Sequence, residues 1–189
     1  TGQVWSCQRL SNGDTLVGAA SQGHLLVVGP EARVRREIKL RNAPGHSCLR
    51  SARQLAGGHF LVAEESAHAA REYDPAGQMV REIQVPFAPY SALRLTNGHT
   101  LVCGQKTMVE VDGRDEVVWR LEGAELPEAG VRWFAGIQVL PNGNVLVCNA
   151  GGRVPFLEIT RDKRLAWQSP ANAIIPLGHG IQRLDTPPP

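Results

Sequence analysis

The sequence predicts an all-β fold: a β-propeller of four-stranded antiparallel blades, with four complete blades and one extra strand. Three observations predict it. A leucine, a polar turn and then Leu-Val recur at intervals of 45, 40 and 45 residues, with anchors at Leu10, Leu55, Leu95 and Leu140. A second block in each repeat reads as strand, polar turn, strand. No segment keeps a helical period for three turns. A period of about 40–45 residues built from strands is typical of propeller blades.

Each blade is expected to hold four strands, A to D along the chain, and strand A ends at the anchor leucine. The Asn-Gly pair that follows (Gly-Gly in the second repeat) favours a tight turn, because both residues accept positive φ. Strand B, such as Val145–Cys148, lacks polar alternation. A strand covered on both faces by neighbouring blades has this pattern.

Strands C and D flank polar turns such as Asp74–Gly77, and strand D alternates more, as an outer strand would. The longest expected connections are loops at 41–47 and 122–132. The repeats run through the whole chain, so we expect one domain over 1–189. The expected blades and the extra strand cover residues 3–40, 47–85, 88–121, 132–169 and 178–184.

The extra strand ends at a fifth anchor, Leu184, 44 residues after the fourth. Unpaired sheet edges promote association, so something is expected to cover them. Three arrangements remain open: a longer propeller of five to eight blades with the missing blades outside this sequence, a last strand that covers an edge, or closure of the ring by a second copy as a homo-oligomer.

The composition excludes several classes of function. The chain has 189 residues and a formal charge of +2, without a basic stripe, so no nucleic-acid partner is expected. No run of 18 apolar residues occurs, so no membrane span is expected. No His, Cys or carboxylate spacing resembles a metal site, and we expect no metal and no cofactor. The cysteines read as small buried hydrophobic residues rather than disulfides: Cys7, Cys48, Cys103 and Cys148.

The sequence begins at Thr1 without a methionine and shows no signal-type apolar segment. We interpret it as a processed or trimmed form that has lost its original targeting signal. We expect a periplasmic or extracellular location.

The segments Leu140–Val147, Glu110–Gly113 and Val117–Trp119 carry a family resemblance. The blades resemble those of arylsulfotransferase-like and quinoprotein-like propellers, and to a lesser degree NHL repeats. In arylsulfotransferase-like proteins a histidine commonly begins strand A and points into the central channel. His179 matches that position, although the usual acidic residue does not follow it. The resemblance therefore implies a propeller fold and suggests His179 as a candidate catalytic residue.

One position varies in chemistry while the scaffold around it repeats. Five residues before each anchor stand Trp5, Arg50, Tyr90, Ala135 and His179. The next position is always small: Ser6, Ser51, Ser91, Gly136 and Gly180. Small residues suit strands that converge on a crowded axis, so the variable position is predicted to line the channel mouth. Arg50, Tyr90 and His179 could hold an anion, while Trp5 and Trp133 could supply a flat face.

Other polar residues are predicted to have structural roles. His46 is expected in a loop, and His59 and His99 occupy equivalent turn positions that suit scaffold hydrogen bonds. Glu72, Glu110 and Glu158 recur once per blade and are expected to serve the scaffold.

Two functional hypotheses follow. The first is a binding or scaffold propeller that recognises a small molecule or a protein partner at the channel mouth, with Trp5, Arg50, Tyr90, Trp133 and His179 as ligand-binding residues. The alternative is an arylsulfotransferase-like or lactone-hydrolase-like enzyme. In that mechanism His179 is nucleophile or general base, and Arg50, with Tyr90 beside it, stabilises the developing negative charge.

Overall fold

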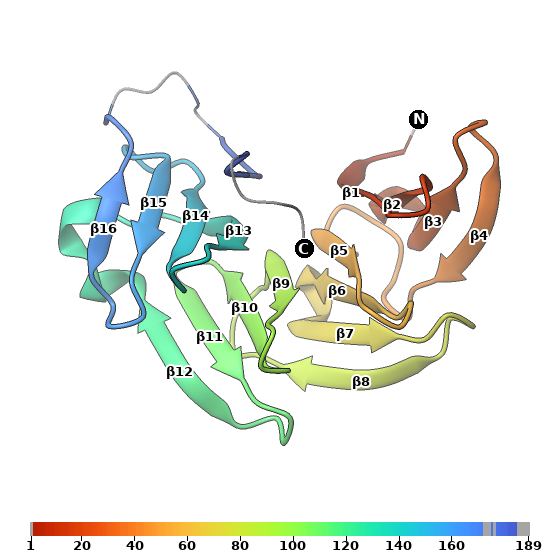
Figure 1. Cartoon of the computed structure of the whole chain (residues 1–189), viewed down its shortest axis with the longest axis horizontal. Coiled ribbons are helices and arrows are strands. Elements are labelled where there is room, and N and C mark those ends of the chain that lie inside the picture. Colours follow the sequence, from red (N-terminus) through yellow and green to blue (C-terminus); the bar gives the residue numbers. More distant parts are fainter. Residues whose placement is uncertain (1, 172–174, 176, 185–189) are drawn as a thin grey trace. The chain divides into compact units, whose positions relative to one another are not determined.

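The computed structural model describes residues 2–171, 175 and 177–184. It contains four four-stranded antiparallel sheets, and the strands of each sheet lie side by side in chain order (Figure 1). This arrangement confirms the prediction of an all-β fold made of propeller blades. Sequential antiparallel pairing is what tight turns between neighbouring strands produce.

The first two sheets comprise β1 (Val4–Arg9), β2 (Thr15–Ala19), β3 (His24–Val28) and β4 (Val34–Lys39), then β5 (Ser51–Gln54), β6 (Phe60–Glu64), β7 (Ala69–Tyr73) and β8 (Met79–Gln84). The last two comprise β9 (Ser91–Arg94), β10 (Thr100–Gly104), β11 (Thr107–Val111) and β12 (Val117–Glu122), then β13 (Phe134–Val139), β14 (Val145–Asn149), β15 (Phe156–Ile159) and β16 (Leu165–Gln168). Short 3-10 helices lie in connections: η1 (Ala20–Gln22), η2 (Glu65–Ala67), η3 (Gly123–Glu125) and η4 (Pro127–Ala129).

The chain forms two compact units, Thr1–Val102 and Cys103–Pro189. The core of the first unit includes Leu16, Leu25, Leu49, Phe60 and Tyr73, each at most 1% exposed. In the second unit the fully buried side chains include Leu121, Leu126, Phe134 and Leu157. Each unit therefore has an apolar core of its own.

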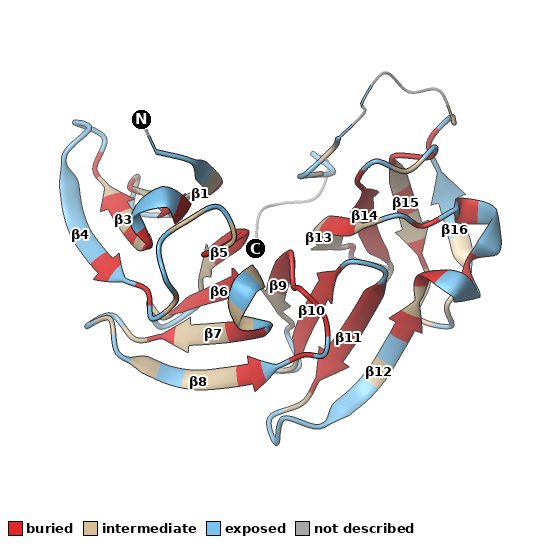
Figure 2. Ribbon diagram, turned by 180° about the vertical axis from the view of Figure 1, so that it is seen from behind, coloured by how far each residue is buried: buried red, intermediate tan, exposed pale blue. Residues whose placement is uncertain are grey.

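Burial follows strand position within a blade (Figure 2). Every residue of β6 and of β14 is buried, whereas β4 buries only Ile38. The apolar second strands and the alternating fourth strands of the sequence are thus the covered and the solvent-facing strands. The expectation for strands B and D is confirmed.

The turn after each anchor leucine is tight, as expected, but its backbone conformation differs from the prediction. In the first repeat the Gly13 N–H donates to the Leu10 carbonyl at 3.0 Å, and Gly13 has a φ of 86°. Asn12 does not adopt positive φ; its side-chain oxygen accepts a hydrogen bond from the Asp14 N–H at 3.0 Å. The prediction of positive φ at both turn residues is therefore wrong for asparagine. It holds in the second repeat, where Gly57 replaces the asparagine with a φ of 91°.

The recurring small residue on the first strand of each blade links neighbouring blades. Ser6 is buried, and its hydroxyl accepts from the Ala52 N–H at 3.0 Å and lies 3.1 Å from the Ala52 carbonyl, to which it donates. The Ser51 hydroxyl accepts from the Ala92 N–H at 3.3 Å. A larger side chain would separate the strands that these hydroxyls join, which explains why the position stays small.

Residues 178–184 do not form the predicted extra strand. They run beside β13, where the Gly136 N–H donates to the His179 carbonyl at 3.0 Å. A Cβ on Gly136 would lie 2.5 Å from that carbonyl oxygen, so only glycine permits this approach. Among the described residues, no further strand pairs with this segment. One backbone hydrogen bond between the described residues does not make the ladder that defines a strand.

Candidate functional site

Three of the five predicted site residues meet in the first unit. The Arg50 guanidinium lies 4.7 Å from the centre of the Trp5 ring and 5.7 Å from the centre of the Tyr90 ring. Trp5 belongs to β1, Arg50 immediately precedes β5, and Tyr90 immediately precedes β9. Residues at the same position on successive inner strands are thereby brought together. Such cation–π contacts hold a guanidinium in place best where water is excluded.

Arg50 also has a counter-ion that the sequence analysis missed. Glu65, the first residue of η2, accepts a hydrogen bond from Arg50 Nε at 2.6 Å, and the same carboxylate oxygen lies 2.6 Å from Arg50 Nη2 as an ion pair. The Arg50 and Glu65 side chains are only 10% and 13% exposed. The pair therefore carries little net charge, and its partners are held rigidly by burial and hydrogen bonding.

A histidine completes this arrangement. The His46 ring meets the Trp5 ring edge-on with centroids 5.0 Å apart, and its Nδ1 lies 3.1 Å from the Gln3 side-chain oxygen. His46 is exposed, as expected for a loop residue, but it contacts the candidate site. Trp5, His46, Arg50, Glu65 and Tyr90 are called the arginine cluster below.

A buried carboxylate adjoins the arginine cluster along the chain. Glu64 is fully buried at the end of β6, where its side chain accepts from the Tyr73 hydroxyl at 2.5 Å and from Arg71 Nη1 at 2.7 Å. Burial raises the pKa of Glu64, although Tyr73 and Arg71 oppose the shift. Burial also raises the pKa of Tyr73, so its hydroxyl stays protonated and donates. This network fixes the strand end from which Glu65 projects.

Trp133 and His179 belong to the second unit. Trp133 lines an open groove of about 380 Å³ together with Gln105, Lys106, Thr107 and Arg132. His179 is exposed, and its carbonyl accepts from Gly136 on β13. The five-residue set of the sequence analysis is thus divided between the two units, three residues in the first and two in the second.

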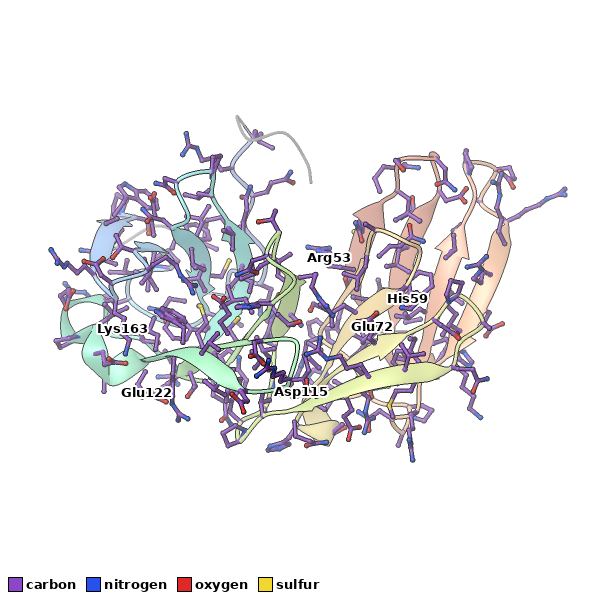
Figure 3. All side chains as sticks on the ribbon, turned by 60° about the horizontal axis from the view of Figure 1, so that its bottom comes forward. Arg53, His59, Glu72, Asp115, Glu122 and Lys163 are labelled. Carbon is purple, nitrogen blue, oxygen red and sulfur yellow. The ribbon has the colours of Figure 1, made fainter. Side chains whose placement is uncertain are left out.

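The carboxylate series contributes to the scaffold. Glu72 holds His59 Nδ1 and Arg94 Nη2 at 2.7 Å each, and Figure 3 shows His59 and Glu72 side by side. At the equivalent place in the fourth blade, Glu158 accepts from Asn144 Nδ2 at 2.7 Å. Glu72 and Glu158 therefore tie the turn before strand B to strand C, whereas Glu110 pairs with Arg161 of the next blade. Over residues 2–171, 175 and 177–184, no group of three or more His, Cys, Asp or Glu could hold a metal ion.

The four cysteines are free thiols, and three of them are buried. Burial raises the pKa of Cys48 to about 11 and that of Cys148 to about 12. These two thiols are therefore protonated near neutral pH and act as small apolar side chains. Cys7 is exposed, which the sequence analysis did not expect. Its place on β1, the open first strand of its sheet, accounts for the exposure.

The described part of the chain contains no helix long and apolar enough to cross a membrane.

The sheets and their order place the chain in the class of β-propellers. No family model matches the sequence, and no curated protein matches it. Solved structures of other proteins are similar to this chain, and three of them are compared with it here.

A protein of unknown function from Bacteroides caccae is similar over 94% of this chain and 69% of its own, with 22% identity and a TM-score of 0.79. Virginiamycin B lyase from Staphylococcus aureus is similar over 90% of this chain, with 12% identity and a TM-score of 0.67. A streptogramin B lyase is similar over 88%, with 13% identity and a TM-score of 0.70.

The chain spans only about half the length of the two lyases, 56% and 54%. At these identities the likeness shows the fold alone. The resemblance to arylsulfotransferase-like, quinoprotein-like and NHL propellers is confirmed only at the level of the propeller fold.

Proposed function

We propose that this chain is a binding module that recognises a small molecule or a partner's side chain at the arginine cluster, at the mouth of the propeller channel. One observation carries the proposal. Three side chains that differ from blade to blade, Trp5, Arg50 and Tyr90, converge at the starts of neighbouring inner strands. Repeats that share a scaffold differ where they meet a ligand.

The chemistry of the cluster favours a planar, uncharged ligand. Glu65 already neutralises Arg50, so an added anion would compete with a carboxylate held at 2.6 Å. The indole of Trp5 is only partly buried, and His46 stands at its edge. The Trp5 indole offers an apolar aromatic surface, and the His46 ring stands perpendicular at its edge as a hydrogen-bonding group, which suits a ring or an amide plane.

The test is a ligand screen read out by NMR. The indole N–H signals of the four tryptophans are recorded while a panel of uncharged planar compounds is added, beginning with nicotinamide and benzamide. We expect the Trp5 signal to move, and Trp5→Leu to abolish binding of the compounds that move it. Trp167→Leu is the matched control, because Trp167 is 48% exposed on β16. Compounds that bind Trp5→Leu as tightly as the original protein would contradict the proposal.

An enzyme remains the second candidate, because two proteins of similar fold are lyases. It requires His179 as base or nucleophile beside Arg50 and Tyr90. The Arg50–Glu65 pair weakens this hypothesis, since a guanidinium already bound to a carboxylate stabilises a new negative charge poorly.

Turnover decides between the two functions. The protein is assayed with virginiamycin B, aryl sulfates, simple esters and lactones. The binding function predicts no turnover above background. Turnover that His179→Ala removes would establish the enzyme instead.

A further inference from the structure

The groove in the second unit is a site of different chemistry, and we infer that it binds a small aromatic anion. The ligand would carry a planar ring against Trp133 and a carboxylate or phosphate between Lys106 and Arg132. The groove volume of about 380 Å³ lies at the lower end of the range for small-molecule sites. This inference does not depend on the function proposed for the arginine cluster.

Uncompensated positive charge is the first argument. Lys106 and Arg132 are exposed, and neither forms an ion pair with any residue that the structure describes. Two cations that line one groove without counter-ions create a positive potential, which draws anions from solution. Arginine in addition presents a flat fork of donors that matches a carboxylate or phosphate.

The nearby acidic residues are already engaged. Glu122 accepts from the Thr107 hydroxyl at 2.8 Å and from Arg120 Nε at 2.6 Å. Glu125 is paired with Lys163 Nζ at 2.8 Å. Figure 3 labels Glu122 and Lys163 in this unit. Their charges are therefore balanced by residues other than Lys106 and Arg132, and the groove stays positive.

The wall formed by the turn between β10 and β11 is fixed. The Gln105 carbonyl accepts from the Phe134 N–H at 2.6 Å, and the Lys106 carbonyl accepts from the Gly123 N–H at 2.7 Å. Gln105 adopts a φ of 48°, in the left-handed region that non-glycine residues rarely occupy. Because backbone hydrogen bonds hold this turn, the side chains of Gln105 and Lys106 project from a rigid backbone.

The opposite wall is fixed by one buried amide. The Asn149 side-chain oxygen accepts from the Arg132 N–H at 2.7 Å and from the Trp133 N–H at 3.4 Å. Asn149 is fully buried. The stem of Arg132 passes close to Gly151, where a Cβ would lie 3.3 Å from Arg132 Cδ. Asn149 and Gly151 therefore position the cation and the indole, and the groove is preformed.

Trp133 supplies the aromatic surface and an unused donor. Its ring is half-buried, and no described residue accepts a hydrogen bond from its shielded Nε1. Because Nε1 is shielded, a ligand would meet the accessible part of the indole, and the N–H would report the contact through its NMR signal. A ring stacked on the indole and an anionic group at the two cations together engage Trp133, Lys106 and Arg132.

The experiment is a titration of the full chain, with the Trp133 indole N–H as the NMR signal. The probes are benzoate and phenyl phosphate; inorganic phosphate has no ring, and benzyl alcohol has no charge. We expect both aromatic anions to shift the Trp133 signal in low salt, more weakly at high ionic strength. We expect inorganic phosphate and benzyl alcohol to bind at least about threefold more weakly, because each lacks one of the two groups.

Charge variants complete the test. Lys106→Gln and Arg132→Gln should each raise the dissociation constant for phenyl phosphate about threefold or more. Arg114→Gln is the matched control: Arg114 is exposed in the turn after β11, at the other end of that strand from Thr107. Surface variants of this kind retain the fold, so unchanged affinity in both groove variants would overturn the inference. No shift of the Trp133 signal with millimolar benzoate or phenyl phosphate would overturn it too, as would equal binding of inorganic phosphate.

Discussion

In the first unit a cation is buried together with its counter-ion, and in the second unit two cations face solvent without one. Both regions use residues next to the start of an inner strand and residues in the connection that follows strand B. The arginine cluster fills these positions with Arg50 and Glu65, which cancel each other's charge. The groove fills them with Arg132 and Lys106, which do not. Comparable segments of the blades therefore hold a buried, neutralised ion pair in one case and two uncompensated cations in the other.

The comparison shows that the ligand preference of a charged residue at a variable position can be inferred only when its ion-pair partner is known. Arg50 has an anion-binding side chain, yet its hydrogen bonds are already used by Glu65. Lys106 follows Gln105 in the turn between β10 and β11, which the sequence analysis did not single out, yet its charge is available. The predictions below measure how far the two regions differ, from the largest expected effect on stability to the smallest.

Removing the counter-ion from the arginine cluster should have the largest effect. Glu65→Gln leaves the Arg50 charge nearly buried and uncompensated, so we expect a loss of about 3 kcal/mol in the free energy of unfolding. Urea denaturation measures it. Glu128→Gln, at an exposed site in η4, is the control and should change stability by less than about 0.5 kcal/mol. Equal effects of the two variants would mean that Arg50 and Glu65 are not a buried pair.

Gly136→Leu should destabilise the second unit by about 1–3 kcal/mol, because the side chain would enter the space held by His179 and Gly180. Loss of amide protection at Gly136 would accompany it. Gly113→Leu is the matched control, since nothing lies within 4 Å of a Cβ at Gly113. Gln78→Leu, in an outer turn, should also cost less than about 0.5 kcal/mol. Equal thermal shifts for Gly136→Leu and its controls would show that residues 178–184 are not packed on β13.

Ser6→Ala should cost about 1 kcal/mol, because it removes both hydrogen bonds that the hydroxyl makes to the Ala52 backbone and leaves the Ala52 N–H without its acceptor. Thermal denaturation measures the change. Ser11→Ala, at an exposed turn position, should have almost no effect. If Ser6→Ala left the thermal stability unchanged, packing alone, and not the hydroxyl, would join β1 to β5.

Lys106→Gln should have the smallest effect on stability, within about 0.5 kcal/mol, and its sign should be favourable or neutral because it relieves repulsion with Arg132. Raising the salt concentration should remove the difference between the variant and the original protein. A large loss of stability would show that Lys106 has a counter-ion, and the contrast with Glu65→Gln would disappear.

The fold could be predicted from the sequence because its signal is local and repeated. Each anchor leucine, turn glycine and apolar strand B lies within a few residues of the next, and the pattern recurs in every blade. The extra strand was not predictable in the same way, since a strand depends on partners on its edges. Residues 178–184 have the sequence of a first strand, but among the described residues a single backbone hydrogen bond, from Gly136 to His179, joins them to β13.

The candidate site was predictable only in part. Trp5, Arg50 and Tyr90 share one place in the repeat, so strand pairing alone brings them together. Glu65 lies in a connection, and its signal was the acidic pair Glu64-Glu65 where the other repeats have small or uncharged residues. The groove joins Lys106 to Arg132, which are far apart in sequence and in no common position of the repeat. The backbone hydrogen bond from Phe134 to Gln105, which brings their two segments together, cannot be predicted from residue types.

The hydrogen bonds between neighbouring inner segments also bear on how the chain folds. The Gln8 side-chain oxygen accepts from the Gln54 N–H at 2.8 Å, and Gln138 accepts from the Arg183 N–H at 2.7 Å in the same way. Each sheet, by contrast, pairs only strands that follow one another. We therefore expect blades to form early and separately as the chain emerges from the ribosome, and these glutamine bonds to form last. Pulse-labelled hydrogen exchange would show the Gln54 and Arg183 amides protected after those of β6 and β14, and the order of assembly would follow the order of the repeats.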